Sequence, residues 1–149
     1  MTRPRVAIAL MAAVAVLAVA VLAPWLAPYD PGETDLASRL LPPSAAHWLG
    51  TDHLGRDLLS RLLWGARASL GAVAAILALV LSIGGAVGIV AGLIGGRVDA
   101  VLMRICEGFM TVPTLVLALF MIGALGTGLA NVVIAIALSH WAFYARLVR

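Results

Sequence analysis

Uncharged apolar stretches alternate with short polar segments along almost the whole chain of 149 residues. The first stretch follows Arg3 and Arg5, and about 20 apolar residues are enough to cross a bilayer core as a helix. We therefore predict a first span over residues 6–26, closed by Pro24 and Pro28 because proline cannot continue the hydrogen-bond ladder of a helix. The length of the stretch argues against a cleaved signal peptide, whose apolar region runs about 7–15 residues.

Residues 30–67 are polar enough to lie outside the membrane, and prolines and glycines make their first half an extended loop. In the second half, leucines occupy one helical face and polar side chains the other, and Asp52 can cap such a helix. Asp57 and Arg61 have the i,i+4 spacing of a stabilising pair worth ~0.2–0.5 kcal/mol. This pattern predicts an amphipathic helix lying in the membrane interface. A helix packed against the other helices is an equal alternative.

Residues 68–96 carry no charge, which is ample for one tilted span over residues 68–94. Within this stretch glycine recurs every fourth residue, at Gly84, Gly88, Gly92 and Gly96. In lipid, such a glycine ladder forms a flat groove that another helix backbone can approach closely, whether that helix belongs to this chain or another. The alternative interpretation is a flexible or broken helix end near Gly96.

A short polar connection follows, and residues 108–145 then contain no charged side chain apart from the titratable His140. This length fits two spans, which we place at residues 105–125 and 129–145 with a break at the glycines between them. Pro113 is expected to kink the first of the two. The sequence thus predicts an all-α integral membrane protein with about four transmembrane helices and one interfacial helix.

Composition supports this class, because 63% of the residues are hydrophobic and 11% are charged, against about 25% charged in soluble domains. All ten basic residues are arginine, so the chain has neither a P-loop lysine nor a Schiff-base lysine. We therefore expect no nucleotide hydrolysis by the P-loop route in this chain. The absence of paired catalytic groups argues against an intramembrane enzyme, and no bound cofactor is expected. The arginines are scattered between apolar runs, which is typical of membrane-flanking charge and not of nucleic-acid binding.

The positions of the arginines also bear on orientation. With the N-terminus in the cytoplasm, six arginines lie inside and four outside, the small majority that the positive-inside rule favours.

Few residues are candidates for binding a substrate or a metal ion. His140, deep in the last span, is a candidate pathway contact, with a packed or interfacial histidine as the alternative. An outer metal site is conceivable, but its spacing matches no defined metal motif, so capping and ion pairing are the preferred roles. That outer set comprises His47, Asp52, His53 and Asp57. The sulfur side chains are interpreted as packing residues; they are Met103, Cys106, Met110 and Met121.

The segment HWLGTDHLGRDLLSRLLWGARASL, residues 47–70, resembles the inner-membrane permease subunits of dipeptide, oligopeptide and nickel ABC importers. The resemblance continues through AGLIGGRVDAVLMR, FMTVPT and the segment from Leu125 to Arg149, and covers nearly the whole chain. Residues 47–57 and 125–149 are most similar to nickel permeases of the C type. The pattern that characterises the family comprises Gly50, Thr51, Asp52, Gly55, Arg56, Asp57, Ser60 and Arg61.

The resemblance implies a permease subunit with a cytoplasmic N-terminus in the bacterial inner membrane. It divides the chain into a tail and first helix at 1–29, an extracytoplasmic loop at 30–67 and a partial type-1 transmembrane domain at 68–149. It also implies four kinds of partner: a second permease subunit, two ATPase subunits that use ATP, an extracytoplasmic solute-binding protein and membrane lipid. Nucleic acid is not among them.

Relatives of this kind have about six spans and an ATPase-docking loop after the fourth, whereas this sequence stops at Arg149. We therefore expect a fragment or truncated product that restores no uptake by itself. The preferred function is nickel uptake, with dipeptide or oligopeptide uptake as the alternative. A structural membrane fragment without transport activity is the alternative of another class, and the segment LGTDHLGRD argues against it.

Overall fold

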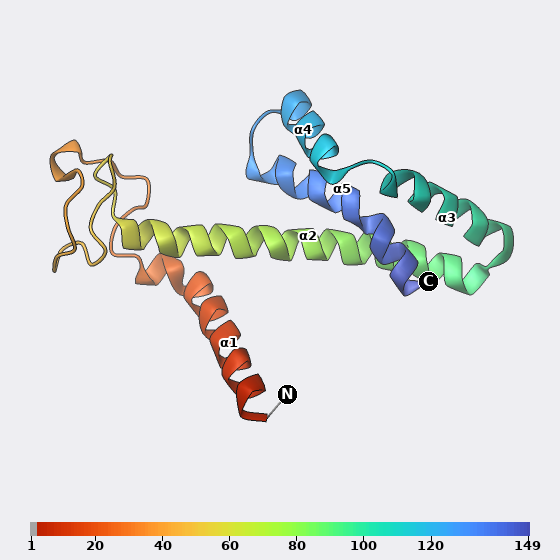
Figure 1. The fold of residues 1–149 in the computed structure, drawn as a ribbon, viewed down its shortest axis with the longest axis horizontal. Coiled ribbons are helices and arrows are strands. Elements are labelled where there is room, and N and C mark those ends of the chain that lie inside the picture. The colour runs from red at the N-terminus through yellow and green to blue at the C-terminus, as the bar shows by residue number, and fades with distance from the viewer. Residues whose placement is uncertain (1–2) are drawn as a thin grey trace. The chain divides into compact units, whose positions relative to one another are not determined.

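A computed structural model describes residues 3–149, and its regular elements are helical (Figure 1). The long helices are α1 (Arg3–Leu26), α2 (Leu58–Ile94), α3 (Gly96–Met110), α4 (Thr114–Leu125) and α5 (Leu129–Val148). A short 3₁₀ helix covers Leu36–Ser38, and no β-strand occurs within residues 3–149. The chain divides into two compact units, Met1–Gly71 and Ala72–Arg149, and each is described by itself.

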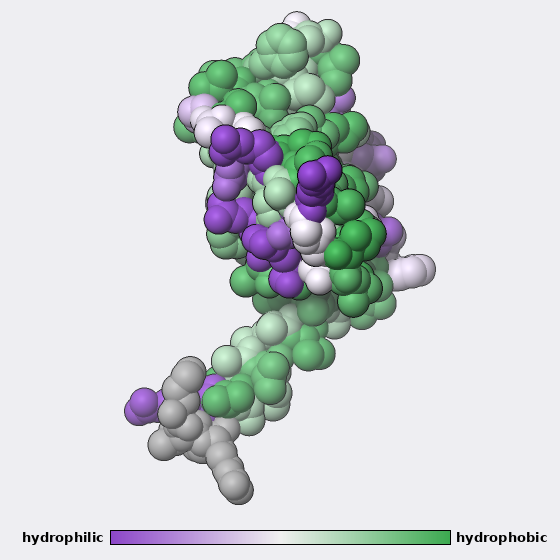
Figure 2. Space-filling view, turned by 90° about the vertical axis from the view of Figure 1, so that its right-hand side faces the viewer, coloured by the Kyte–Doolittle hydropathy of each residue, from purple (hydrophilic) through white to green (hydrophobic). Residues whose placement is uncertain are grey.

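Within residues 3–149, three helices are long and apolar enough to cross a membrane: Arg5–Leu26, Leu58–Ile94 and Leu129–Val148. The pair formed by α3 and α4 adds a fourth candidate, a broken span or re-entrant loop bent by 77°. Large apolar side chains are exposed on the helices, and apolar surface predominates over α1 and much of the face in Figure 2. These features confirm the predicted all-α membrane class.

The first helix agrees closely with its predicted span. α1 continues through Pro24 and ends at Leu26, so Pro24 does not itself close the helix. The N–H of Ala27 still donates to the carbonyl of Ala23 at 2.9 Å. The helix therefore ends just before Pro28.

The predicted interfacial helix is not a separate element, which corrects the sequence interpretation. α2 begins at Leu58 and continues without interruption to Ile94, a length of 37 residues. The segment around Asp52 lies before the helix, and the residue that caps α2 is Asp57 and not Asp52. No proline lies between Leu58 and Ile94, so no residue in this stretch removes a ladder hydrogen bond.

The predicted third span is divided in two. α3 already begins at Gly96, and the helix breaks at residues 111–113 before α4 starts at Thr114. Pro113 lies at the break, as expected from its missing N–H. The break before α5 falls at Gly126, whose φ of +86° lies in the left-handed region.

The core of the unit Ala72–Arg149 is small and built mainly from alanine and sulfur side chains. Its buried cluster comprises Ala91, Met103, Cys106, Ala142 and Ala145, with Val87, Leu102 and Trp141 packed against it. These residues come from α2, α3 and α5. Small side chains allow the three helices to approach closely without a large apolar core.

Candidate functional site

Two glycines of the family pattern are required by the fold of the loop between α1 and α2. Gly50 and Gly55 have φ values of +77° and +76°, where side chains with a Cβ are strained. A Cβ at Gly50 would also collide with the carbonyl oxygen of Leu41, and one at Gly55 with that of Asp35. The loop therefore folds back on itself with its backbones in direct contact at these two points.

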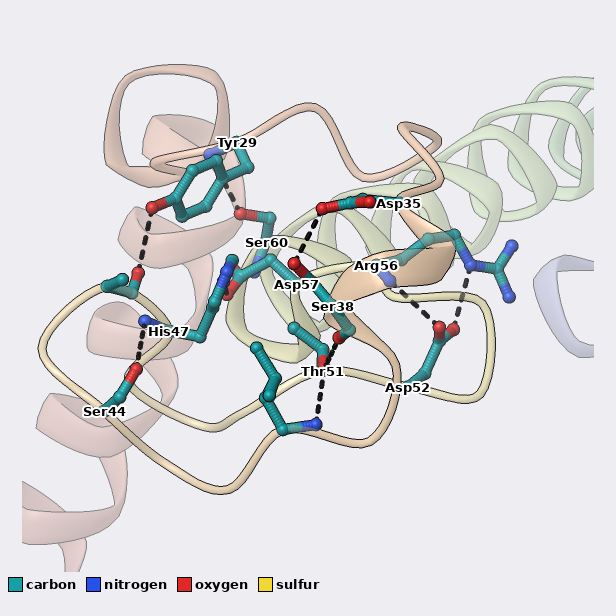
Figure 3. A network of polar contacts seen from close by, with 12 residues as sticks. Tyr29, Asp35, Ser38, Ser44, His47, Thr51, Asp52, Arg56, Asp57 and Ser60 are labelled. Atoms are coloured by element: carbon teal, nitrogen blue, oxygen red, sulfur yellow. Dashed lines mark hydrogen bonds and ion pairs between the residues drawn. The ribbon is translucent and has the colours of Figure 1, made fainter.

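Asp52 accepts hydrogen bonds from backbone and arginine groups of this loop (Figure 3). Its Oδ1 accepts the N–H groups of Leu54 at 2.7 Å and Arg56 at 3.0 Å. Its Oδ2 accepts the Arg56 Nε–H at 2.9 Å and also pairs with Arg61. Burial opposes ionisation of the carboxyl group, but these hydrogen bonds and the guanidinium charge outweigh it and hold the pKa of Asp52 well below its ordinary value.

Asp57 caps the first turn of α2. Its Oδ2 accepts the N–H of Ser60 at 2.8 Å, and its Oδ1 lies 3.0 Å from Nδ1 of His47. Burial would raise the pKa of Asp57, but the Ser60 N–H and the His47 ring together lower it. The hydroxyl oxygen of Ser60 accepts the N–H of Tyr29 at 3.1 Å, so the same turn also holds the chain just after α1 (Figure 3).

The ion pairs differ from those predicted by local spacing. Arg61 pairs with Asp52 instead of Asp57, and Asp57 pairs with His47. These partners do not lie on one face of a helix. The fold of the loop brings them together, so i,i+4 spacing cannot predict the pairs. Asp57 thus caps α2 and pairs with His47, and Asp52 pairs with Arg56 and Arg61. Within residues 3–149 no group of three or more His, Cys, Asp or Glu side chains is arranged to hold a metal ion.

One further polar residue of the loop, Asp35, was not singled out from the sequence, and Thr51 was named there only as part of the family pattern. Asp35 caps the 3₁₀ helix through the hydroxyl of Ser38 at 2.6 Å and the N–H of Ala37 at 3.0 Å, and these bonds lower its pKa. The spacing Asp-x-x-Ser is the signal that could have identified this cap. Thr51 donates to the carbonyl of Ser38 and accepts the N–H of Leu41 at 2.9 Å.

Glycines of the ladder face α5 within the unit Ala72–Arg149. A Cβ at Gly84 would lie 2.6 Å from the carbonyl oxygen of Trp141, and one at Gly88 would lie 2.5 Å from that of Ala145. At Gly92 the corresponding distance, to the carbonyl oxygen of Arg149, is 2.9 Å. The two helix backbones are in contact along this edge, and no side chain larger than hydrogen fits between them.

Gly96 differs from the other three glycines of the ladder, because no helix in the described part of the chain packs against it. No atom lies within 4 Å of a Cβ built there, and its φ is +57°. Gly95, with φ +65°, precedes it at the break between α2 and α3. The broken-helix alternative describes these two positions, because only glycine adopts such a backbone at no steric penalty.

The remaining candidate residues lie apart from the loop. His140 is exposed on α5, and its Nδ1 lies 2.9 Å from the carbonyl oxygen of Ile136. Met103 and Cys106 are buried in the helix cluster, whereas the Met110 sulfur lies 3.9 Å from the Arg146 guanidinium. The assignment of His140 to a transport pathway stays a prediction.

One ion pair joins two helices of the unit Ala72–Arg149. Asp99 in the first turn of α3 pairs with Arg149 at the end of α5. The carboxylate lies at a helix N-terminus and the guanidinium at a helix C-terminus, the arrangement that both helix dipoles favour.

Two family models match the chain. Residues 84–149 match a model described as a binding-protein-dependent transport system inner membrane component. Residues 3–43 match one described as the N-terminal TM domain of oligopeptide transport permease C.

Curated relatives match most of the chain. The nickel transport system permease protein NikC of Escherichia coli K12 is 59% identical over 97% of this chain and 52% of its own length. The probable D,D-dipeptide transport system permease protein DdpC of the same strain is 46% identical, over 91% of this chain and 46% of its own length. The dipeptide transport system permease protein DppC of Bacillus subtilis 168 is 39% identical, over 87% of this chain and 41% of its own length.

The chain therefore spans about half the length of the curated relatives that it matches. Their names describe permeases and not enzymes. The described part of the chain has three to four candidate membrane spans and a loop built around the family pattern. Together with these features, the matches show that the chain belongs to the inner-membrane permease family of ABC importers.

Proposed function

We propose that this chain forms part of the permease subunit of an ABC importer that takes up nickel across the cytoplasmic membrane. The observation that carries the choice of substrate is the 59% identity with a nickel permease over 97% of the chain. The D,D-dipeptide relative, at 46%, is the basis for a second candidate, uptake of short peptides. The peptide candidate is also supported by the match of residues 3–43 to an oligopeptide permease model.

In this proposal the chain binds no cofactor of its own, and a separate ATPase hydrolyses ATP. A second permease subunit, two ATPase subunits and an extracytoplasmic solute-binding protein complete the importer. The N-terminus lies in the cytoplasm, which places the loop between α1 and α2 on the outer side. The six-against-four distribution of arginines supports this orientation.

The close contact between α2 and α5 supports a mechanical role in transport. Two helices in backbone contact at Gly84 and Gly88 have little freedom to slide or separate. Such a pair moves as one body when helices rock about a shared pathway in alternating access.

A chimera tests the substrate assignment. Residues 1–149 would replace the matching half of the E. coli nickel permease in cells whose own nickel importers are deleted and whose remaining importer components are intact. We expect uptake of radioactive nickel that stops when cellular ATP is depleted. A second chimera, with the matching half of the D,D-dipeptide relative, is the control and should transport less nickel.

The outcomes separate the three functions. Nickel uptake no greater than in the control chimera, together with restored uptake of dipeptide, would favour the peptide permease. A chimera that inserts and assembles normally but transports neither substrate would favour the structural membrane role.

A further inference from the structure

The register between α1 and the start of α2 is fixed by two hydrogen bonds within the unit Met1–Gly71. The N–H of Tyr29 donates to the hydroxyl oxygen of Ser60 at 3.1 Å. Eight residues earlier in the chain, the carbonyl of Val21 accepts the Arg67 Nη1–H at 3.0 Å. The two segments therefore run in opposite directions, and positions midway between the two bonds lie at the same level.

Trp25 and Trp64 occupy those midway positions. Their exposed fractions are 77% and 37%, so neither ring is held inside the unit. On the side of the two tryptophans away from the loop, both helices are uncharged: α1 has no charged residue from Trp25 back to Val6, and α2 has none after Arg67. On the other side lies the charged loop. Tryptophan is enriched where a membrane protein passes from hydrocarbon to water, because its ring is apolar and its N–H is polar.

Arg67 lies three residues, about 4.5 Å along the helix axis, to the apolar side of Trp64. Its guanidinium contacts a neutral backbone carbonyl and lies 5.9 Å from the centre of the Trp64 ring. Among residues 5–149, whose side chains the structure describes, no carboxylate lies within ion-pair distance of it. Arg56 and Arg61 in the loop, by contrast, both pair with Asp52.

We propose that Trp25 and Trp64 mark the membrane–water boundary on the loop side, and that Arg67 binds the phosphate group of a phospholipid there. An arginine at this depth needs a counter-charge, and its long side chain can reach the headgroup layer. A guanidinium has five N–H donors, and a phosphate accepts two of them in parallel. The Val21 carbonyl uses one donor and leaves the others for the lipid. The proposal does not depend on the transported substrate.

Depth-dependent quenching tests the boundary. The chain would be reconstituted in nanodiscs containing phosphatidylcholine brominated at a shallow or a deep acyl position. Variants retaining Trp25 alone or Trp64 alone, with the other tryptophans replaced by Phe, should be quenched more strongly by the shallow bromine. Stronger quenching by the deep bromine in either variant would overturn the placement.

Lipid binding tests the role of Arg67. Adducts of phosphatidylglycerol would be counted by native mass spectrometry for the wild type, Arg67→Gln, Arg67→Lys and the matched control Arg39→Gln, which removes an exposed loop arginine. We expect Arg67→Gln to bind about fivefold more weakly, since an arginine near an anionic surface contributes about that factor. Arg39→Gln should bind at least half as tightly as the wild type. Arg67→Lys keeps the charge but not the two parallel donors, so its binding should lie between that of Arg67→Gln and that of the wild type.

The circular dichroism of each variant would verify that the helices are intact. Equal lipid binding by Arg67→Gln and the wild type would refute the proposal. Equal losses in Arg67→Gln and Arg39→Gln would refute it too, because they would indicate a general effect of surface charge.

Discussion

Replacing Gly88 by alanine would place a methyl carbon 2.5 Å from the carbonyl oxygen of Ala145, and 2.9 Å from the Cβ of Val148. The first of these atoms belongs to the backbone of α5, so no change of rotamer can relieve the contact. Ordinary van der Waals contact begins at 3.4 Å, and α2 and α5 would have to separate by roughly 0.9 Å.

The expected destabilisation follows from a comparison with the neighbouring glycine. Overpacking by one methyl group in a close-packed contact costs about 1–3 kcal/mol. Alanine also favours a helix over glycine by about 1 kcal/mol, which would conceal part of that loss. Gly85 lies in the same helix with no atom within 4 Å of its Cβ position, so Gly85→Ala has the same propensity gain without the collision. Gly88→Ala should therefore be less stable than Gly85→Ala by about 1–3 kcal/mol.

Unfolding of the chain in mixed micelles with increasing sodium dodecyl sulfate measures this difference. The fluorescence of Trp141 on α5 reports the contact once the other three tryptophans are replaced by Phe, and circular dichroism reports helix content. Equal unfolding midpoints for Gly88→Ala and Gly85→Ala would show that the backbones of α2 and α5 are not in contact at Gly88.

Three further results are expected from the loop and the helix core. Asp57→Ala removes the cap of α2 and should cost about 1 kcal/mol, seen as faster amide hydrogen exchange in its first turn, whereas Glu33→Ala should leave that turn unchanged. The pKa values of Asp52 and Asp57 are lowered from 3.8 in the folded loop, so the stabilisation that they provide is complete only well above that pH and is lost as the pH falls through the folded values. Exchange protection of the loop, corrected for intrinsic rates, should be constant from neutral pH to about 4.5 and decline at lower pH; a decline beginning near pH 6 would instead indicate a histidine. Cys106 is fully buried, so it should react with N-ethylmaleimide only after unfolding, whereas Arg104→Cys in a Cys106→Ala background should react at once.

The sequence located the membrane helices well because a run of uncharged residues is a local property. The end of α1 at Leu26 and the start of α5 at Leu129 agree with the predicted spans. The start of α2 was misplaced by ten residues, since a change from polar to apolar composition was interpreted as an element boundary. Nothing in the sequence breaks the helix there, and α2 continues through Gly65 and Gly71.

The partners of the loop residues could not be predicted, because they depend on how the loop folds back. His47 and Asp57 lie ten positions apart, as do Leu41 and Thr51, and no local periodicity relates such pairs. The glycine ladder likewise predicted a close neighbour without identifying it. That neighbour is α5, more than fifty positions further along the chain.

The uncharged part of α2, from Ala68 to Ile94, extends for roughly 40 Å along the helix axis. A bilayer with a hydrocarbon core of about 30 Å covers that length only if the helix inclines by roughly 40°, near the upper limit seen for such helices. Hydrophobic mismatch of this kind is relieved in thicker membranes. Lipids with longer acyl chains should therefore let α2 stand more upright, and acyl-chain length becomes a control over the inclination of the helix that carries the glycine contacts.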